Sequence, residues 1–188
     1  MSQQELVKFV VRALTNAGIH YMLTGSTVSS IQGVWRATHG IDIVVSLNTS
    51  NIKAITDEFP EPNFYSSDEA IRDAIKRQRM FNGLDTVEGG KLDFWILTNT
   101  PFDRSRFARR ISKRYSDMDV LVSTPEDTII AKLRWAKECG ESEKQFVDAL
   151  RVYEIQHGIL DIAYLERWVA ILGLERFWKR LLAEARVV

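Results

Sequence analysis

The sequence has one cysteine, Cys139, and no long run of apolar residues. A single thiol cannot form a disulfide within the chain or a cysteine-based metal cluster, so we expect it to serve in helix packing. The apolar runs are far shorter than the ~20 residues that cross a bilayer, and the first residues lack the pattern of a signal peptide. These absences speak against disulfide-stapled and membrane-spanning proteins and predict a cytoplasmic protein.

Neither sign of charge is in excess over the whole chain, which has 25 Lys and Arg against 25 Asp and Glu. The charge is nevertheless uneven, because residues 72–114 contain eleven Lys and Arg against five Asp and Glu. The stretch RSRFARRISKR, Arg104 to Arg114, carries six of these bases around Phe107. Such a composition suits contact with a phosphate backbone. A solvated edge strand protected by its charge is an equal alternative.

At 188 residues, the chain is long enough for one full core and a small helical appendage. Apolar spacing and turn residues predict helices in its first part at 3–17, 26–34, 48–59, 66–78 and 101–108. Strands are predicted at 20–25, 41–47, 80–85 and 91–97, followed by a strand or hairpin within 109–123. The predicted fold class is α/β (α+β), a mixed sheet flanked by helices.

From Thr124 onward the pattern becomes helical. In TPED, Thr124 is a candidate N-cap, Pro125 takes the first helical position and Asp127 reaches back to the cap. Further helices are predicted at 143–156, 161–172 and 174–186, with breaks at Gly158 and Gly173. We therefore expect an α/β domain over residues 1–123 and a helical region packed on it over residues 124–188.

Three features of the first part carry candidate chemistry. Gly25 and Ser26 follow a predicted strand and open a helix, where free backbone amides and a hydroxyl can bind an anion. An ordinary strand-to-helix turn capped by serine is the alternative. Asp42 and Asp93 stand alone in the apolar strands IDIVV and KLDFWIL, where an ionised carboxylate is costly unless it is paired or metal-bound.

These residues carry a family resemblance. The run TGSTVSSIQGVWRATHGIDIVV resembles the signature of the DNA-polymerase-beta-like nucleotidyltransferases, in which Gly-Ser is followed about a dozen residues later by Asp-x-Asp. KLDFWIL resembles the strand that bears the third acid. PFDRSRFARR and TPEDTIIAKLRWAK are similar to a bacterial branch of minimal nucleotidyltransferases, the abortive-infection toxins of toxin–antitoxin systems. The resemblance extends from about Tyr21 to Trp168.

The resemblance implies a nucleotidyltransferase-type sheet and a role for each motif residue. Gly25 and Ser26 would bind the triphosphate of an NTP, Asp42 would hold Mg²⁺ or Mn²⁺, and Asp93 would share the metal and help to activate the attacking hydroxyl. Arg36 and Lys132 are further candidates for contact with phosphate. For Lys132, a solvated surface lysine is the favoured alternative.

The departure from the family signature is Gly40, which stands where the first Asp of Asp-x-Asp is expected. One hypothesis is a transferase that moves a nucleotide to RNA, such as tRNA, or to protein, impaired by this glycine. Another is a non-catalytic nucleotide or RNA binder with an antitoxin-like partner. A third is that the glycine replaces the native acid of an active enzyme. Residues two apart share one face of a strand, so position 40 is expected beside Asp42.

Overall fold

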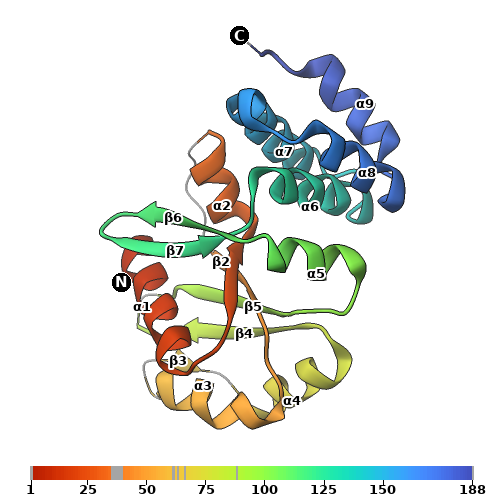
Figure 1. Ribbon diagram of the computed structural model, residues 1–188. Coiled ribbons are helices and arrows are strands. Elements are labelled where there is room, and N and C mark those ends of the chain that lie inside the picture. Colours follow the sequence, from red (N-terminus) through yellow and green to blue (C-terminus); the bar gives the residue numbers. More distant parts are fainter. Residues whose placement is uncertain are drawn as a thin grey trace. The chain divides into compact units, whose positions relative to one another are not determined.

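The computed structural model describes residues 2–34, 40–60, 62, 64, 65, 67–87 and 89–187. The chain divides into two compact units, whose helices and strands are drawn in Figure 1. One unit is formed by Met1–Thr24 with Thr38–Val122, and the other by Gly25–Ala37 with Ser123–Val188.

The first unit is built on a seven-stranded mixed sheet with the strand order β3-β4-β5-β2-β1-β7-β6. The β2–β5 and β1–β7 pairs are parallel, and the remaining pairs are antiparallel. This confirms the predicted mixed sheet. The strands are β1 (Tyr21–Thr24), β2 (Gly40–Val45), β3 (Phe64–Tyr65), β4 (Met80–Asp85), β5 (Lys91–Ile96), β6 (Ile111–Tyr115) and β7 (Met118–Val122).

Helices of this unit begin where polar caps precede apolar spacing. At the start of the first helix, Ser2 and Glu5 form a reciprocal capping box. Thr100 caps the helix that opens at Pro101. The helices are α1 (Gln3–Asn16), α3 (Ile52–Glu58), α4 (Asp68–Arg77) and α5 (Pro101–Ala108), with the short 3-10 turn η1 (Thr49–Asn51) before α3. The predicted helices at 3–17, 48–59, 66–78 and 101–108 are thereby confirmed.

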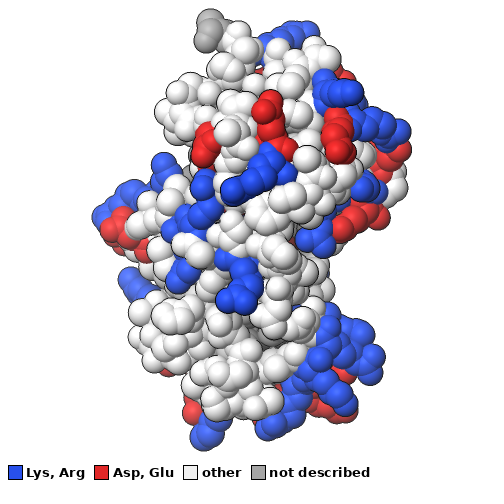
Figure 2. Space-filling view, turned by 45° about the vertical axis from the view of Figure 1, so that its right-hand side comes forward, with Lys and Arg blue, Asp and Glu red and all other residues white. Residues whose placement is uncertain are grey.

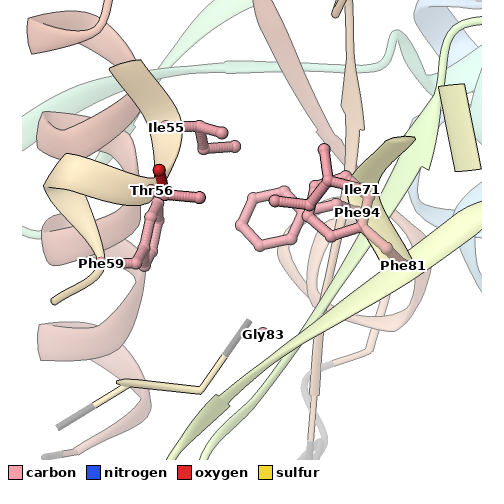
Figure 3. A pocket seen from close by; sticks show the side chains of 7 residues that line it. All are labelled: Ile55, Thr56, Phe59, Ile71, Phe81, Gly83 and Phe94. Atoms are coloured by element: carbon pink, nitrogen blue, oxygen red, sulfur yellow. The ribbon is translucent and has the colours of Figure 1, made fainter. Parts of the chain in front are cut away.

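One face of the sheet is aromatic. Phe94 of β5 stacks on Phe81 of β4 at 4.9 Å between ring centroids and meets the edge of Phe59, after α3, at 5.7 Å. Strand β4 continues through Gly83. A Cβ at this position would lie 3.2 Å from the Phe94 ring, so glycine leaves room for the ring. Figure 3 shows the small apolar pocket on this face, lined by Ile55, Thr56, Phe59, Ile71, Phe81, Gly83 and Phe94.

The opposite face is covered near α5. Phe107 of α5 packs against Met22 and Val44, with Trp95 at the margin of this cluster. Successive side chains of a strand point to opposite faces. Asp93 therefore lies on the same face as Trp95, away from the aromatic layer.

The second unit is helical. It consists of α2 (Gly25–Gln32), α6 (Pro125–Glu138), α7 (Glu143–Gln156), the 3-10 turn η2 (His157–Ile159), α8 (Ile162–Leu172) and α9 (Glu175–Glu184). These bounds confirm the helices predicted after residue 124 and the break at Gly173. Cys139 ends α6 and is exposed, so the prediction that it serves in helix packing is wrong.

The first helix of this unit comes from far upstream in the sequence. Gln32 of α2 donates a 2.7 Å hydrogen bond to the Ser123 carbonyl, and its own carbonyl accepts one of 2.7 Å from Gln156 of α7. The expected division at residue 123 had assigned residues 25–37 to the first domain, whereas the structure groups them with the C-terminal helices. Hydrophobic spacing predicts that a helix forms, but it does not predict against which part of the chain the helix packs.

Among the described residues, no helix is both long enough and apolar enough to cross a membrane. The expected cytoplasmic location stays a prediction.

Candidate functional site

The two predicted acids lie side by side on neighbouring parallel strands. Asp42 of β2 pairs in register with Asp93 of β5. The register continues the row on both sides, with Thr24 of β1 opposite Asp42 and Asn82 of β4 opposite Asp93. Adjacent strands are about 4.8 Å apart, and residues opposite each other project from the same face. Four strands thus contribute one polar row, which we call the Asp42–Asp93 row.

Both carboxylates accept from protein donors. The Trp95 indole donates to Asp42 Oδ1 at 3.2 Å. Asp93 Oδ1 accepts a short hydrogen bond from the Asn82 side-chain amide and lies 3.0 Å from the Lys91 ammonium. The Asp93 side chain is only 17% exposed, so these contacts replace much of the water that would otherwise solvate its charge.

Position 40 faces this row. A Cβ built on Gly40 would lie 3.8 Å from Asp93 Oδ2 and 3.5 Å from the Lys91 carbonyl oxygen, both ordinary contact distances. Its backbone is not in the left-handed region, so a side chain is tolerated without strain. The structure therefore directs position 40 toward the Asp93 carboxylate.

The chemistry of the donor set decides what this row can hold. Asp42 and Asp93 offer the hard oxygen ligands that Mg²⁺ and Mn²⁺ prefer, and they fit a site for one such ion. Gly40 supplies no third carboxylate. Within the described part of the chain, no group of three His, Cys, Asp or Glu side chains is arranged to hold a metal ion.

The predicted phosphate-binding turn lies in the second unit. Helix α2 opens at Gly25, whose φ of +67° is in the left-handed region that favours glycine. This conformation lets the chain pass from Thr24, the last residue of β1, into the helix without an intervening loop. The Ser26 carbonyl accepts from the hydroxyls of Ser29 and Ser30 at 3.1 and 2.9 Å, which ties down the first turn.

Lys132 lies beside this turn. Its ammonium is 3.5 Å from the Ser26 hydroxyl oxygen and donates to Asp148 Oδ2 and Gln145 Oε1 of α7, each at 2.8 Å. The Lys132 side chain is 6% exposed, so the solvated-lysine alternative is wrong. Burial of a lysine requires such partners, because an unpaired ammonium is costly away from water. Its predicted contact with phosphate stays a prediction.

The structure separates what sequence reasoning found from what it missed. Arg36 lies outside the described residues. Lys91 was missed, although it precedes Asp93 by two residues, the same spacing that pointed from Gly40 to Asp42. Trp95 was missed as a donor because the apolar run KLDFWIL does not show toward which acid its indole N–H is directed. Asp148 had no signal, since its helix meets Lys132 only through tertiary packing.

The basic stretch predicted for phosphate contact is partly engaged within the protein. Arg106 forms a largely buried ion pair with Asp103 at 2.8 Å. Arg110 lies over the Phe107 ring at 4.4 Å. The bases of this stretch that are exposed are Arg104, Lys113 and Arg114. The edge-strand alternative describes β6 correctly, because β6 is the last strand of the sheet.

Comparison of the sequence with protein-family models and with curated proteins finds no match. Comparison with solved structures finds an antigenic nucleotidyltransferase-like protein from Paracoccidioides brasiliensis, 13% identical with a TM-score of 0.55, covering 98% of this chain and 94% of that one. It also finds ANT(2")-Ia in complex with adenylyl-2"-tobramycin, 11% identical with a TM-score of 0.61, covering 94% of this chain and 99% of that one. The solution structure of ANT(2'')-Ia, an antibiotic-resistance factor, is 12% identical with a TM-score of 0.53, and the match covers 97% of this chain and 94% of that one. The chain thus has the nucleotidyltransferase fold.

Proposed function

We propose that this protein binds a nucleoside triphosphate together with a divalent metal ion, and that nucleotide transfer is impaired because position 40 has no carboxylate. One observation supports the proposal above others. Asp42 and Asp93 pair in register, and the Cβ position of Gly40 is directed toward Asp93. The fold supports the reaction class, and the glycine supports the impairment.

In this proposal each predicted residue has a defined task. Asp42 and Asp93 would hold Mg²⁺ or Mn²⁺, which would supply positive charge to offset the negative charge of the phosphates. Trp95 and Asn82 orient the two carboxylates through their hydrogen bonds. A positioned Asp93 also accepts the proton of an attacking hydroxyl.

The triphosphate itself is assigned to the opening of α2. The first backbone amides of a helix lack intrahelical acceptors and favour an anion. The Lys132 ammonium, which is paired with Asp148, is a further hydrogen-bond donor close to Ser26. Arg36 is retained as a further phosphate contact from the sequence resemblance.

The acceptor is proposed from chemistry alone. A hydroxyl on RNA, such as tRNA, or on a protein fits a reaction in which a carboxylate takes up the hydroxyl proton. The alternative function is a non-catalytic nucleotide and RNA binder with an antitoxin-like partner. The exposed bases Arg104 and Lys113 favour a polyanion as ligand in either case, whereas Arg114 is paired with Asp119.

The test combines thermal unfolding with label transfer. A nucleotide at ~100 times its dissociation constant should stabilise the fold by about 2.7 kcal/mol. We expect such a shift in melting temperature with at least one NTP, for the protein as given and for Gly40→Asp. Transfer of label from the NTP to total RNA or protein should rise in Gly40→Asp. The control is Gly40→Ala, which adds only the Cβ.

The outcomes separate the two functions. A melting shift with transfer only in Gly40→Asp supports an impaired transferase. A melting shift without transfer in any variant supports the non-catalytic binder. The absence of a shift with every NTP at millimolar concentration, with or without Mg²⁺ or Mn²⁺, would contradict nucleotide binding itself.

A further inference from the structure

A cation of the protein lies beside the Asp42–Asp93 row. The Lys91 ammonium lies 3.0 Å from Asp93 Oδ1, with the Lys91 side chain half exposed and that of Asp93 17% exposed. Lys91 and Asp93 are two residues apart on β5, so both side chains leave the strand on one face. The contact therefore follows from the strand geometry.

The position of Lys91 is coupled to the glycine of the opposite strand. Lys91 pairs in register with Gly40. A Cβ at position 40 would lie 3.8 Å from the Lys91 Cβ and 3.8 Å from Asp93 Oδ2. Any carboxylate placed at position 40 would thus lie next to both the Lys91 stem and the carboxylate that Lys91 contacts.

A carboxylate at position 40 would change the formal charge around Asp93. Two carboxylates and one ammonium leave a formal charge of −1, and a third carboxylate in place of Gly40 would make it −2. The ammonium and the Asn82 amide both contact Asp93 Oδ1, whereas Oδ2 is the oxygen nearest the Cβ position of Gly40, so the ammonium acts on an ion at this carboxylate through its charge. A divalent ion must displace or tolerate the ammonium, at a cost set by their repulsion.

We propose that Lys91 is the resident cation of the Asp42–Asp93 row and competes with the divalent metal ion for Asp93. Gly40 and Lys91 both lower the affinity for the metal ion, because Gly40 provides no ligand and Lys91 adds a positive charge. The inference rests on the proposed function, since it concerns the metal site assigned there. It follows that Gly40→Asp alone restores metal affinity only in part, because the new carboxylate also pairs with Lys91.

The test is Mn²⁺ binding measured by titration calorimetry, without nucleotide and without any assay of activity. We expect Lys91→Met to tighten Mn²⁺ binding by about tenfold, the effect of a unit charge about 6 Å from a divalent ion in a water-like medium. Lys91→Arg keeps the charge and should bind Mn²⁺ as the unchanged protein does. In the Gly40→Asp background, Lys91→Met should tighten binding by more than it does alone.

The matched control is Lys113→Met. Lys113 is exposed on β6, four strands from β5 and therefore about 19 Å away, beyond the screening length at physiological salt. It should leave Mn²⁺ affinity unchanged. Thermal melting of every variant verifies that each is folded.

The failures can be told apart. If Gly40→Asp tightens Mn²⁺ binding while Lys91→Met changes nothing in either background, the inference about Lys91 is overturned and the proposed metal site stands. An equal gain from Lys113→Met would also overturn it, since the effect would then be one of net charge. If no variant, including Gly40→Asp/Lys91→Met, binds Mn²⁺ at millimolar concentration, both the inference and the proposed metal site are overturned.

Discussion

At the scale of single residues, the two lysines near the predicted site differ in how they are solvated. Lys91 is half exposed and meets one carboxylate at the margin of the sheet. Lys132 is buried between α6 and α7, with Asp148 and Gln145 as its partners. A buried ion pair contributes little net stability compared with apolar residues, and the loss of one member is costly.

Lys132→Met should therefore destabilise the protein strongly. It leaves the Asp148 carboxylate buried without its ammonium, for which we expect a loss of about 3–5 kcal/mol in the free energy of unfolding. Lys132→Met/Asp148→Leu should recover most of that loss, because it removes both charges. Urea unfolding of the three proteins measures this. Equal losses in the single and double variants would show that packing, and not charge, decides.

The same residues show how far sequence reasoning reaches. Asp42 and Asp93 were expected to matter because a lone acid in an apolar strand needs a partner, and the structure brings them together. The register that forms the row could not be predicted, because spacing within one strand does not tell which strand lies beside it. The burial of Lys132 could not be predicted either, because Asp148 lies on another helix and local spacing contains no information on how two helices pack.

At the scale of elements, the positions of helices follow from caps and apolar spacing, while their contacts depend on close packing. Helix α2 illustrates the second point, because Gly33 directly after it lies against the backbone of α7. A Cβ there would lie 3.0 Å from the Ser29 carbonyl oxygen, 3.1 Å from the Arg151 carbonyl carbon and 3.1 Å from the Val152 nitrogen. Backbone atoms cannot rotate away as a side chain can.

Gly33→Ala should therefore separate α2 from α7 and cost about 1–3 kcal/mol, the usual range for overpacking. The control is Gly158→Ala in η2, where a Cβ would meet no atom within 4 Å and φ is not positive. That variant should be neutral or slightly stabilising, because alanine restricts the unfolded chain. Urea midpoints compare the two. Equal stability of both variants would mean that α2 adjusts to the added methyl group at no cost.

At the scale of the whole molecule, a net charge of zero conceals local differences. Figure 2 shows Lys and Arg side chains in separate groups over the face that it draws, several of them beside Asp and Glu. Many bases are in fact paired, as Arg180 is with Glu143 and Glu184. The hydrogen bonds from Arg180 lower the pKa of Glu143, because they stabilise its charged form. Only exposed bases that are not paired with an acidic side chain are available to bind a polyanion.

Binding of the whole protein to RNA should weaken as the salt concentration rises, because exposed bases replace the counterions of the phosphates. Each contact between a base and a phosphate releases counterions. In a log–log plot of affinity against salt concentration, the magnitude of the slope should therefore decrease by about 0.7 for each contact with a single strand that a substitution removes. We expect Arg104→Gln/Lys113→Gln to reduce this slope by about 1.4. Arg106→Gln should change it little, because Arg106 pairs with Asp103.

Lys144→Gln/Lys179→Gln, which removes two exposed charges from the helical unit, is the control of equal net charge. Filter binding to a single-stranded RNA between 50 and 200 mM salt gives the slopes. An equal reduction by both double variants would mean that net charge alone attracts RNA, and salt-independent binding would leave β6 as a charged sheet edge without a role in recognition.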